Sequence, residues 1–141
     1  MKKNLTFEYV GCFFEWSVLD KVLENIEHIR LDRQIKYPHI TFSYMPEFID
    51  ETLWGEKVRV RITGYGNDGE NEGFKVELVS EDRKLQKEFA EIEVPHITIS
   101  VSETGKPINT RYLEYIPVEP VEVEGVYGGY NLSCDSVEFA L

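Results

Sequence analysis

The sequence has only two cysteines among its 141 residues, Cys12 and Cys134, and they form no CxxC pair. Two cysteines are too few for the disulfide framework of a small secreted domain. Without a dense group of cysteines and histidines, a structural zinc site is not predicted either. We therefore expect two reduced thiols in a cytoplasmic protein, with a single disulfide between them as the alternative.

Positive charge is also scarce, because 15 Lys and Arg residues stand against 26 Asp and Glu residues, a net charge of −11. A long nucleic acid is held largely by many cationic contacts to its phosphates, so we expect no long nucleic acid as a partner. A local positive pocket is still compatible with this composition. A small nucleotide or oligonucleotide therefore stays open as a substrate.

Long apolar runs are missing as well. No window of the sequence approaches the roughly 20 apolar residues that a helix needs to cross a bilayer, so no membrane partner is expected. The apolar segment near the start is interrupted by Glu8, and no small-residue cleavage site follows it. This segment is therefore expected to be a strand and not a signal peptide.

The residues that are present are typical of a folded globular domain. Apolar residues make up 42% of the chain and aromatic residues 13%. A chain of 141 residues has the length of one domain, and its six prolines are scattered without a compositional break. We predict a single domain over residues 1–141, and the oligomeric state stays open.

The periodicity of apolar residues predicts an α+β fold. An apolar stripe with helical spacing predicts a helix over 17–31, which Ser17 and Asp20 would begin as a capping box. A second helix is expected over 81–90, with Ser80 as its cap. Strands are predicted at 5–14, 38–44, 56–66, 73–79, 95–101, 121–130 and 136–141, with a helical turn at 110–115. Hairpins with two main helices favour a mostly antiparallel sheet.

One unusual hexapeptide occurs twice. PHITFS, which contains His39 and Thr41, returns 57 residues later as PHITIS, which contains His96 and Thr98. Alternate side chains of a strand share a face, so each copy presents histidine and hydroxyl groups on one face and apolar groups on the other. If the two strands lie side by side, these four side chains meet in one pocket on a rigid sheet. The alternative is two unrelated amphipathic strands, each with a proline where it begins.

This set of side chains suits the cleavage of a phosphodiester beside a ribose hydroxyl, or the hydrolysis of a cyclic phosphate. Either reaction needs a base on one side of phosphorus and an acid on the other. Imidazole titrates at about pH 6.5, so we expect one neutral and one protonated histidine to coexist at neutral pH. The threonine hydroxyls would donate hydrogen bonds to the phosphate oxygens. No cofactor is needed; a metal held by two histidines and a carboxylate is the alternative.

The two H-x-T segments resemble the paired signature of the two-histidine (2H) phosphoesterase superfamily. This superfamily includes RNA 2′,3′-cyclic phosphodiesterases, bacterial 2′-5′ RNA ligase-like proteins, and phage anti-CBASS nucleases that destroy cyclic oligonucleotide signals. The resemblance implies a bilobal α+β fold with pseudo-two-fold symmetry and the motifs on facing central strands. It also implies that His39 and His96 are the acid/base pair and that Thr41 and Thr98 hold the phosphate. The short chain is nearer the small viral and phage members.

These features favour a metal-independent phosphodiesterase that cleaves a cyclic oligonucleotide, a 2′-5′ oligonucleotide or a 2′,3′-cyclic phosphate. One alternative is an RNA-end or RNA-repair cyclic phosphodiesterase, which predicts a basic track near the motifs from Lys57, Arg59, Arg61 and Lys106. Another is a non-catalytic protein that sequesters a nucleotide in the same cleft. The sequence leaves open which nucleotide is cleaved and which histidine is the base.

Five further residues are candidate substrate contacts. Ser43 and Ser100 share the predicted face of the two histidines. Lys106 lies in a turn after the second motif and is either a phosphate ligand or a solvated lysine. Tyr127 and Tyr130 lie in the glycine-rich segment GVYGGYN, where they either stack on a base or belong to a bulged strand.

Two other features are expected to be structural. His28 falls late in the first predicted helix, where a histidine favours the helix dipole. The acidic segment GNDGENEG lacks the register of a calcium-binding loop, so we expect it to form a plain hairpin tip.

Overall fold

The computed structural model describes all 141 residues and consists of many strands and a few short helices. Its strands are β1 (Lys2–Lys3), β2 (Tyr9–Phe13), β3 (Arg33–Gln34), β4 (His39–Tyr44), β5 (Phe48–Ile49), β6 (Lys57–Asn67), β7 (Asn71–Leu78), β8 (His96–Val101), β9 (Ile116–Asn131) and β10 (Ser136–Glu138). Its helices are α1 (Trp16–Leu23), α2 (Arg83–Ala90) and the 3-10 helix η1 (Pro107–Tyr112). None of the helices has the length and apolar character of a membrane span.

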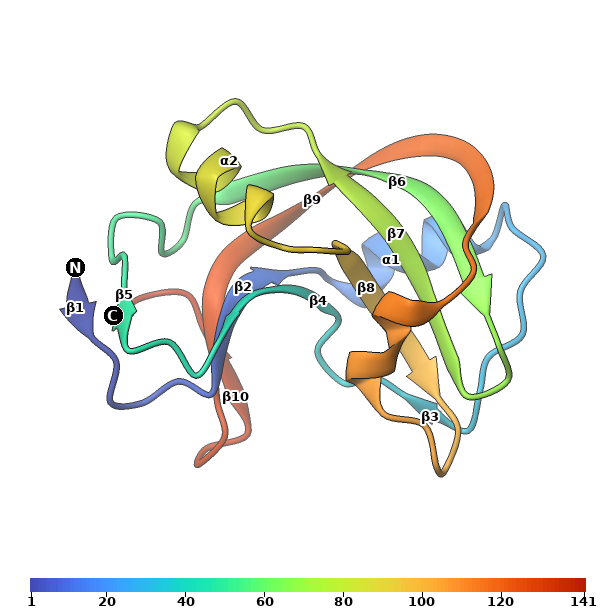
Figure 1. Cartoon of the computed structure of the whole chain (residues 1–141), viewed down its shortest axis with the longest axis horizontal. Coiled ribbons are helices and arrows are strands. Elements are labelled where there is room, and N and C mark those ends of the chain that lie inside the picture. The colour runs from blue at the N-terminus through green and yellow to red at the C-terminus, as the bar shows by residue number, and fades with distance from the viewer.

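One antiparallel sheet makes up most of the molecule (Figure 1). Its strands follow the order β3-β8-β7-β6-β9-β2-β4, and β10 pairs with β9 outside this path. β1 and β5 form a separate two-stranded ribbon. With only two α-helices beside this sheet, the prediction of an α+β fold with a mostly antiparallel sheet is confirmed.

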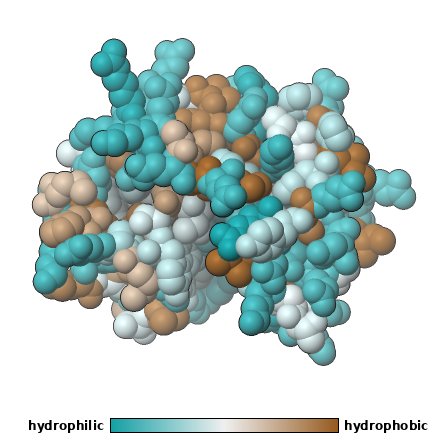
Figure 2. Space-filling model, viewed as in Figure 1, coloured by the Kyte–Doolittle hydropathy of each residue, from teal (hydrophilic) through white to brown (hydrophobic).

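Alternation along β6 separates a buried face of the sheet from an exposed one. Val58, Val60 and Ile62 are fully buried, whereas Arg59 and Arg61 point outward and form ion pairs with glutamates of β7 and β9. This is the pattern predicted for the segment, and β6 and β7 form the predicted hairpin. Figure 2 shows polar and charged side chains across the viewed surface, with only small, separate apolar areas.

Both α-helices bury an apolar stripe in the same core as the strands. From α1 the core receives Leu19 and Leu23, and from α2 it receives Leu85 and Phe89. Cys12 is fully buried in this core. Cys12 and Cys134 are both free, and Cys134 is exposed.

The first helix begins earlier and ends earlier than predicted. Glu15 is the N-cap residue and makes no side-chain capping bond, so Ser17 does not begin the helix. After Leu23 the backbone tightens, because the N–H of Ile26 donates to the carbonyl of Leu23, three residues back. The residues that follow continue as an irregular segment toward β3, although their apolar spacing resembles that of a helix.

Two other predictions about helix ends are wrong. His28 lies beyond α1, and its Nδ1 is 2.9 Å from the carbonyl oxygen of Ile26, so it does not interact with a helix dipole. α2 is capped by Asp82, whose side chain accepts hydrogen bonds from the first turn. Ser80 instead accepts a hydrogen bond from the N–H of Arg59 and ties the end of β7 to β6.

The strands that carry the two motifs are separated in the sheet by four others, β7, β6, β9 and β2. Nevertheless, Cα atoms of β4 and β8 come within 8 Å of each other. The sheet must therefore curve strongly, and Figure 1 shows both strands near the middle of the molecule. This curvature brings two segments together that are distant in both sequence and strand order.

The two motif strands have the same local irregularity. The register of β4 against β2 skips Phe42, and the register of β8 against β7 skips Ile99. Each skipped residue directly follows the threonine of its motif and forms a β-bulge, which reverses the alternation of side chains beyond it. Ser43 and Ser100 therefore turn away from the histidine face, which corrects the predicted arrangement.

A glycine lies opposite the threonine of each motif, Gly11 in β2 and Gly73 in β7. A Cβ atom at Gly11 would lie 2.0 Å from the carbonyl oxygen of Ile40. A Cβ atom at Gly73 would lie 2.8 Å from the carbonyl oxygen of Ile97, the matching residue of the second motif. The backbones approach this closely only because no side chain lies between them.

We expect the substitutions Gly11→Ala and Gly73→Ala to lower the free energy of unfolding by about 2–4 kcal/mol each, because the added methyl group collides with backbone. Urea unfolding measures the change. Gly69→Asn is the control, since Gly69 has open space around its α-carbon and a left-handed φ that asparagine tolerates. A Gly11→Ala protein as stable as the control would contradict the close strand approach.

Candidate active site

The two H-x-T motifs line one cavity of about 590 Å³, here called the two-histidine pocket. His39 and Thr41 reach it from β4, and His96 and Thr98 reach it from β8. Its other lining residues are Glu8, Tyr9, Ile35, Lys36, Tyr37, Tyr44, Ile92, Glu93, Val94, Pro107, Ile108, Arg111, Tyr130, Leu132 and Asp135. The structure thus brings together the four side chains that the sequence singled out.

The two imidazole rings are held in the same way. Nδ1 of His39 lies 2.8 Å from the carbonyl oxygen of Tyr37, and Nδ1 of His96 lies 2.7 Å from that of Val94. A carbonyl oxygen only accepts hydrogen bonds, so Nδ1 donates in both rings. Nε2 is consequently the nitrogen that remains without a partner in the chain, and it is the atom available for proton transfer.

Burial lowers the pKa of both histidines. Desolvation brings the pKa of His39 to about 4; the bond to the Tyr37 carbonyl opposes this shift, and the charge of His96 adds to it. Desolvation also lowers the pKa of His96, and the positive charge of Arg111 acts in the same direction. Without ligand, both rings are therefore neutral at pH 7. This differs from the expected mixture of one neutral and one protonated ring, because burial penalises the imidazolium form.

Aromatic rings form the wall of the pocket beside the first motif. Tyr9 stacks on the His39 ring with a centroid distance of 4.4 Å and on Tyr130 with a distance of 5.2 Å. Tyr37 packs on Tyr130 at 6.0 Å. Of these tyrosines the sequence indicated only Tyr130. Tyr9 and Tyr37 carry no motif, and only the pairing of β2 with β4 and β9 places Tyr9 beside the histidine.

The two motif threonines have different surroundings. Thr41 is partly exposed, and its hydroxyl makes no hydrogen bond within the chain. Thr98 is only 6% exposed, and its hydroxyl lies 2.8 Å from Oγ1 of Thr110 and 3.2 Å from the carbonyl oxygen of Pro107. Thr98 therefore fastens η1 to β8, whereas Thr41 is free to bind a ligand.

The helix η1 brings a cation into the pocket that the sequence did not single out. The guanidinium of Arg111 lies 4.7 Å from the centroid of the Tyr112 ring, and its Nη2 donates to the Tyr112 hydroxyl. Nε of Arg111 is buried without a partner. The other lining cation, Lys36, is held by Asp135 at 2.6 Å. Arg111 is thus the lining cation that no carboxylate neutralises.

Four predicted substrate contacts are not among the residues that line the pocket. Ser43 and Ser100 are turned away by the two β-bulges, and Ser100 is fully buried. Tyr127 is three positions from Tyr130 on the same strand, so the two side chains take opposite faces, and Tyr127 packs in the core. Lys106 is exposed beside η1, outside the lining.

The structure also shows where the residues of the expected basic track lie, and whether side chains gather that could hold a metal ion. Arg59 and Arg61 of the expected basic track form ion pairs with glutamates on the outer face of the sheet, and Lys57 lies beside them. None of the track lines the two-histidine pocket. The structure contains no group of three or more His, Cys, Asp or Glu side chains arranged to hold a metal ion.

The lowered pKa of His39 predicts a pH dependence of stability. The unfolded chain takes up this proton at about pH 6.5 and the folded chain only at about 4. The free energy of unfolding should therefore fall as the pH is lowered through this interval, with a contribution from His39 of up to roughly 3 kcal/mol. Urea unfolding across this range should show a shallower pH slope for His39→Gln. The exposed His28→Gln variant should keep the full slope, and equal slopes in all three proteins would contradict the burial of His39.

Comparison with known proteins assigns no family to the chain. No protein-family model matches it, and no curated protein matches it. The function proposed below therefore rests on the paired motif and on the geometry of the pocket.

Proposed function

We propose that this protein is a metal-independent phosphodiesterase of the two-histidine type that acts on a small nucleotide. The observation that carries the proposal is the pair of imidazole rings in one cavity, with the same tautomer and with each Nε2 unpaired. Such a pair can take a proton from the nucleophile on one side of phosphorus and give a proton to the leaving oxygen on the other.

The repeated construction of the sheet supports the resemblance to the two-histidine phosphoesterases. On one side of the centre the strand order is β9-β2-β4, on the other it is β6-β7-β8, and β6 pairs with β9 between them. Both motif strands have the same bulge and face a glycine. We propose that these strand triplets form two lobes related by a pseudo-two-fold axis, with the two-histidine pocket between them.

The protonation states needed for catalysis follow from the charge of the ligand. Both rings are neutral in the free protein, and a phosphodiester brings negative charge next to them, which favours the protonated form of one ring. The neutral ring then takes the proton of a ribose hydroxyl or of water, and the protonated ring supplies the proton of the leaving oxygen. Each proton transfer contributes a factor of roughly 10²–10⁴ to the rate.

Stabilisation of the phosphate is assigned to Thr41 and Arg111. The free hydroxyl of Thr41 can donate to a non-bridging oxygen, where negative charge builds up in the transition state. The unneutralised guanidinium of Arg111 supplies a charge-assisted donor from η1, beside the second motif. This assignment replaces Thr98, whose hydroxyl is engaged with η1.

The pocket favours a compact substrate. Its volume of about 590 Å³ is within the range of about 300–1,000 Å³ that is usual for small-molecule sites. The tyrosine wall offers flat surfaces for a nucleobase. Lys36 and Arg111 are the only lining cations, and Lys36 is paired with Asp135, so the pocket offers too few cationic contacts for a long phosphate backbone. A cyclic oligonucleotide, a 2′-5′ oligonucleotide or a 2′,3′-cyclic phosphate therefore fits better than an RNA tract.

A substrate panel tests the proposal. The protein is incubated with cyclic di- and trinucleotides, 2′-5′ oligoadenylate and 2′,3′-cyclic phosphates, and the products are read by mass spectrometry, with and without a chelator. Turnover of one class that resists the chelator is expected. Binding without conversion would favour a sequestering protein, and activity lost to the chelator and restored by zinc or manganese would favour a metal enzyme.

The variants His39→Ala and His96→Ala should each lower kcat on the substrate found in the panel by at least about 10²-fold, because each removes one of the two proton transfers. His28→Ala is the matched control, since this exposed histidine lies outside the pocket and should leave kcat unchanged. Normal turnover by either pocket variant would refute the acid/base assignment.

The substitutions Thr41→Val and Thr98→Val should separate the ligand-binding role proposed for Thr41 from the structural role of Thr98. Thr41→Val should lower kcat by about tenfold or more with little change in stability, because its hydroxyl has no partner in the chain. Thr98→Val should lower the free energy of unfolding by about 1–2 kcal/mol, because it leaves the buried hydrogen-bonding groups of η1 unpaired. Kinetics and urea unfolding measure the two effects. A stable Thr98→Val protein would show that η1 does not depend on this hydroxyl.

A further inference from the structure

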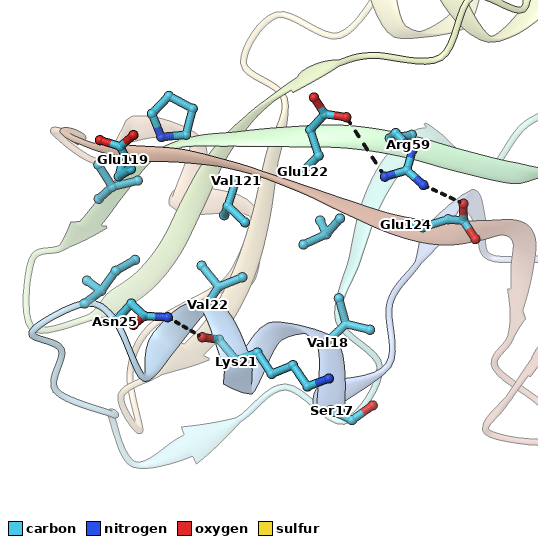
Figure 3. A pocket seen from close by; sticks show the side chains of 14 residues that line it. Ser17, Val18, Lys21, Val22, Asn25, Arg59, Glu119, Val121, Glu122 and Glu124 are labelled. Carbon is cyan, nitrogen blue, oxygen red and sulfur yellow. Dashed lines mark hydrogen bonds and ion pairs between the residues drawn. The ribbon is translucent and has the colours of Figure 1, made fainter.

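A second cavity, of about 800 Å³, lies between α1 and β9 and shares no residue with the two-histidine pocket (Figure 3). On one side of β9, Val121 faces α1 across the cavity. On the other side of the same strand, Glu122 and Glu124 meet Arg59, and these three residues also line the cavity. A neighbouring strand at this edge would separate the two faces of β9. Residues from both faces can therefore line one cavity only where no strand pairs with that edge.

The strand pairing shows the same open edge. β9 pairs with β6 over most of its length, but it pairs with β2 only from Val126 onward. The N–H of Tyr127 donates to the carbonyl of Glu56, and its carbonyl accepts from the N–H of Gly55, so both groups point to the side of β9 on which β6 lies. Because these groups alternate in direction along an antiparallel strand, Glu122 and Glu124 direct their N–H and carbonyl groups away from β6, to the open edge. No strand pairs with them there, and none of the backbone hydrogen bonds outside the helices and strands involves them.

We propose that this edge of β9 is a docking site for an extended segment of a partner protein, which adds one strand to the sheet. An unpaired edge offers main-chain hydrogen bonds to any extended segment, and adjacent side-chain pockets decide which segment binds. Here the cavity provides an apolar surface on one side, made by Val18, Val22 and Ile26 of the α1 region with Val121. Glutamates occupy the other side.

The chemistry of the partner segment follows from the strand that already occupies the other edge of β9. Residues 57–62 of β6 read KVRVRI; their apolar side chains enter the core, and their arginines form ion pairs with Glu122 and Glu124. A strand on the open edge would lie beside the same two faces of β9, one apolar and one that carries the glutamates. It therefore needs apolar residues that face α1, alternating with lysine or arginine beside the glutamates.

A second copy of the chain fits this edge less well. Antiparallel pairing of two β9 edges brings the glutamates of one copy beside those of the other, and like charges at opposed positions destabilise a sheet. The net charge of −11 adds to this repulsion. Pro117 and Pro120 limit the docking portion to the residues that follow, which suits a short segment.

A peptide with the β6 sequence, acetyl-KVRVRIT-amide with a fluorescent label, probes the site by fluorescence anisotropy with the full chain. The charge-reversed peptide EVEVEIT is the matched control, and it should bind at least about tenfold more weakly. Glu122→Pro removes the edge N–H and leaves the ladder with β6 intact, so it should abolish binding more completely than Glu122→Gln. Equal affinity for the two peptides, or unchanged binding by Glu122→Pro, would overturn the proposal.

Hydrogen exchange locates the bound strand and does not depend on a variant that folds. Peptide binding should slow exchange at the amides of Glu122 and Glu124 and leave those of Val121 and Val123, already in the ladder with β6, unchanged. Protection spread evenly over the sheet would refute an edge-specific site. Protection of the same amides that rises with protein concentration in the absence of peptide would instead identify a second copy as the occupant.

Discussion

The close backbone contact between each motif strand and its glycine-bearing neighbour is the constraint on which the pocket depends. Gly11 and Gly73 let β2 and β7 lie against the carbonyls that precede the motif threonines. At the same level a bulge leaves the next residue of each motif strand unpaired, which adds local bend and twist. The strong curvature of the sheet carries β4 and β8 toward each other, and the histidines follow because they begin these strands.

The two motif strands share a bulge and a facing glycine, but their surroundings differ. Each ring is held by a carbonyl two residues back, so both expose the same nitrogen. Tyrosines and a free threonine lie beside the first motif, whereas η1 and a buried threonine lie beside the second. Burial of the rings disfavours their charged form and lowers both pKa values. Under the proposed function, the negative charge of the phosphodiester would offset this effect. In the proposed mechanism, the pair becomes competent for proton transfer only when a negatively charged substrate occupies the pocket.

The long strand β9 links the pocket to the rest of the sheet. Its later residues pair with β2 and carry Tyr130 into the pocket wall. Its earlier residues extend beyond the end of β2, since the chain leaves that strand to form α1. One consequence is a sheet edge with unpaired backbone groups next to an apolar helix. The ladder with β6 sets the register of this part of the strand, and ion pairs between the two strands lie across it.

Much of this protein is determined by its sequence alone. The alternation in β6, the hairpin to β7 and the apolar faces of α1 and α2 depend on local periodicity, so the α+β class and the antiparallel sheet could be predicted. The doubled hexapeptide likewise indicated His39, Thr41, His96 and Thr98, because identical residues at identical spacing need no tertiary information to be noticed.

Only the tertiary structure decided the remaining features, because they depend on contacts between distant segments. The β-bulges turn Ser43 and Ser100 away from the histidine face. They depend on the register between paired strands, which the alternation of apolar and polar residues along one strand does not encode. The roles of Tyr9 and Arg111 depend on which strand lies beside β4 and on where η1 packs. The depressed pKa values of the histidines depend on how much solvent the assembled walls exclude, and the open edge of β9 depends on where β2 ends. The short-range pattern of apolar and polar residues determines where helices and strands form and which of their faces is buried. Strand pairing, packing and desolvation decide which side chains meet.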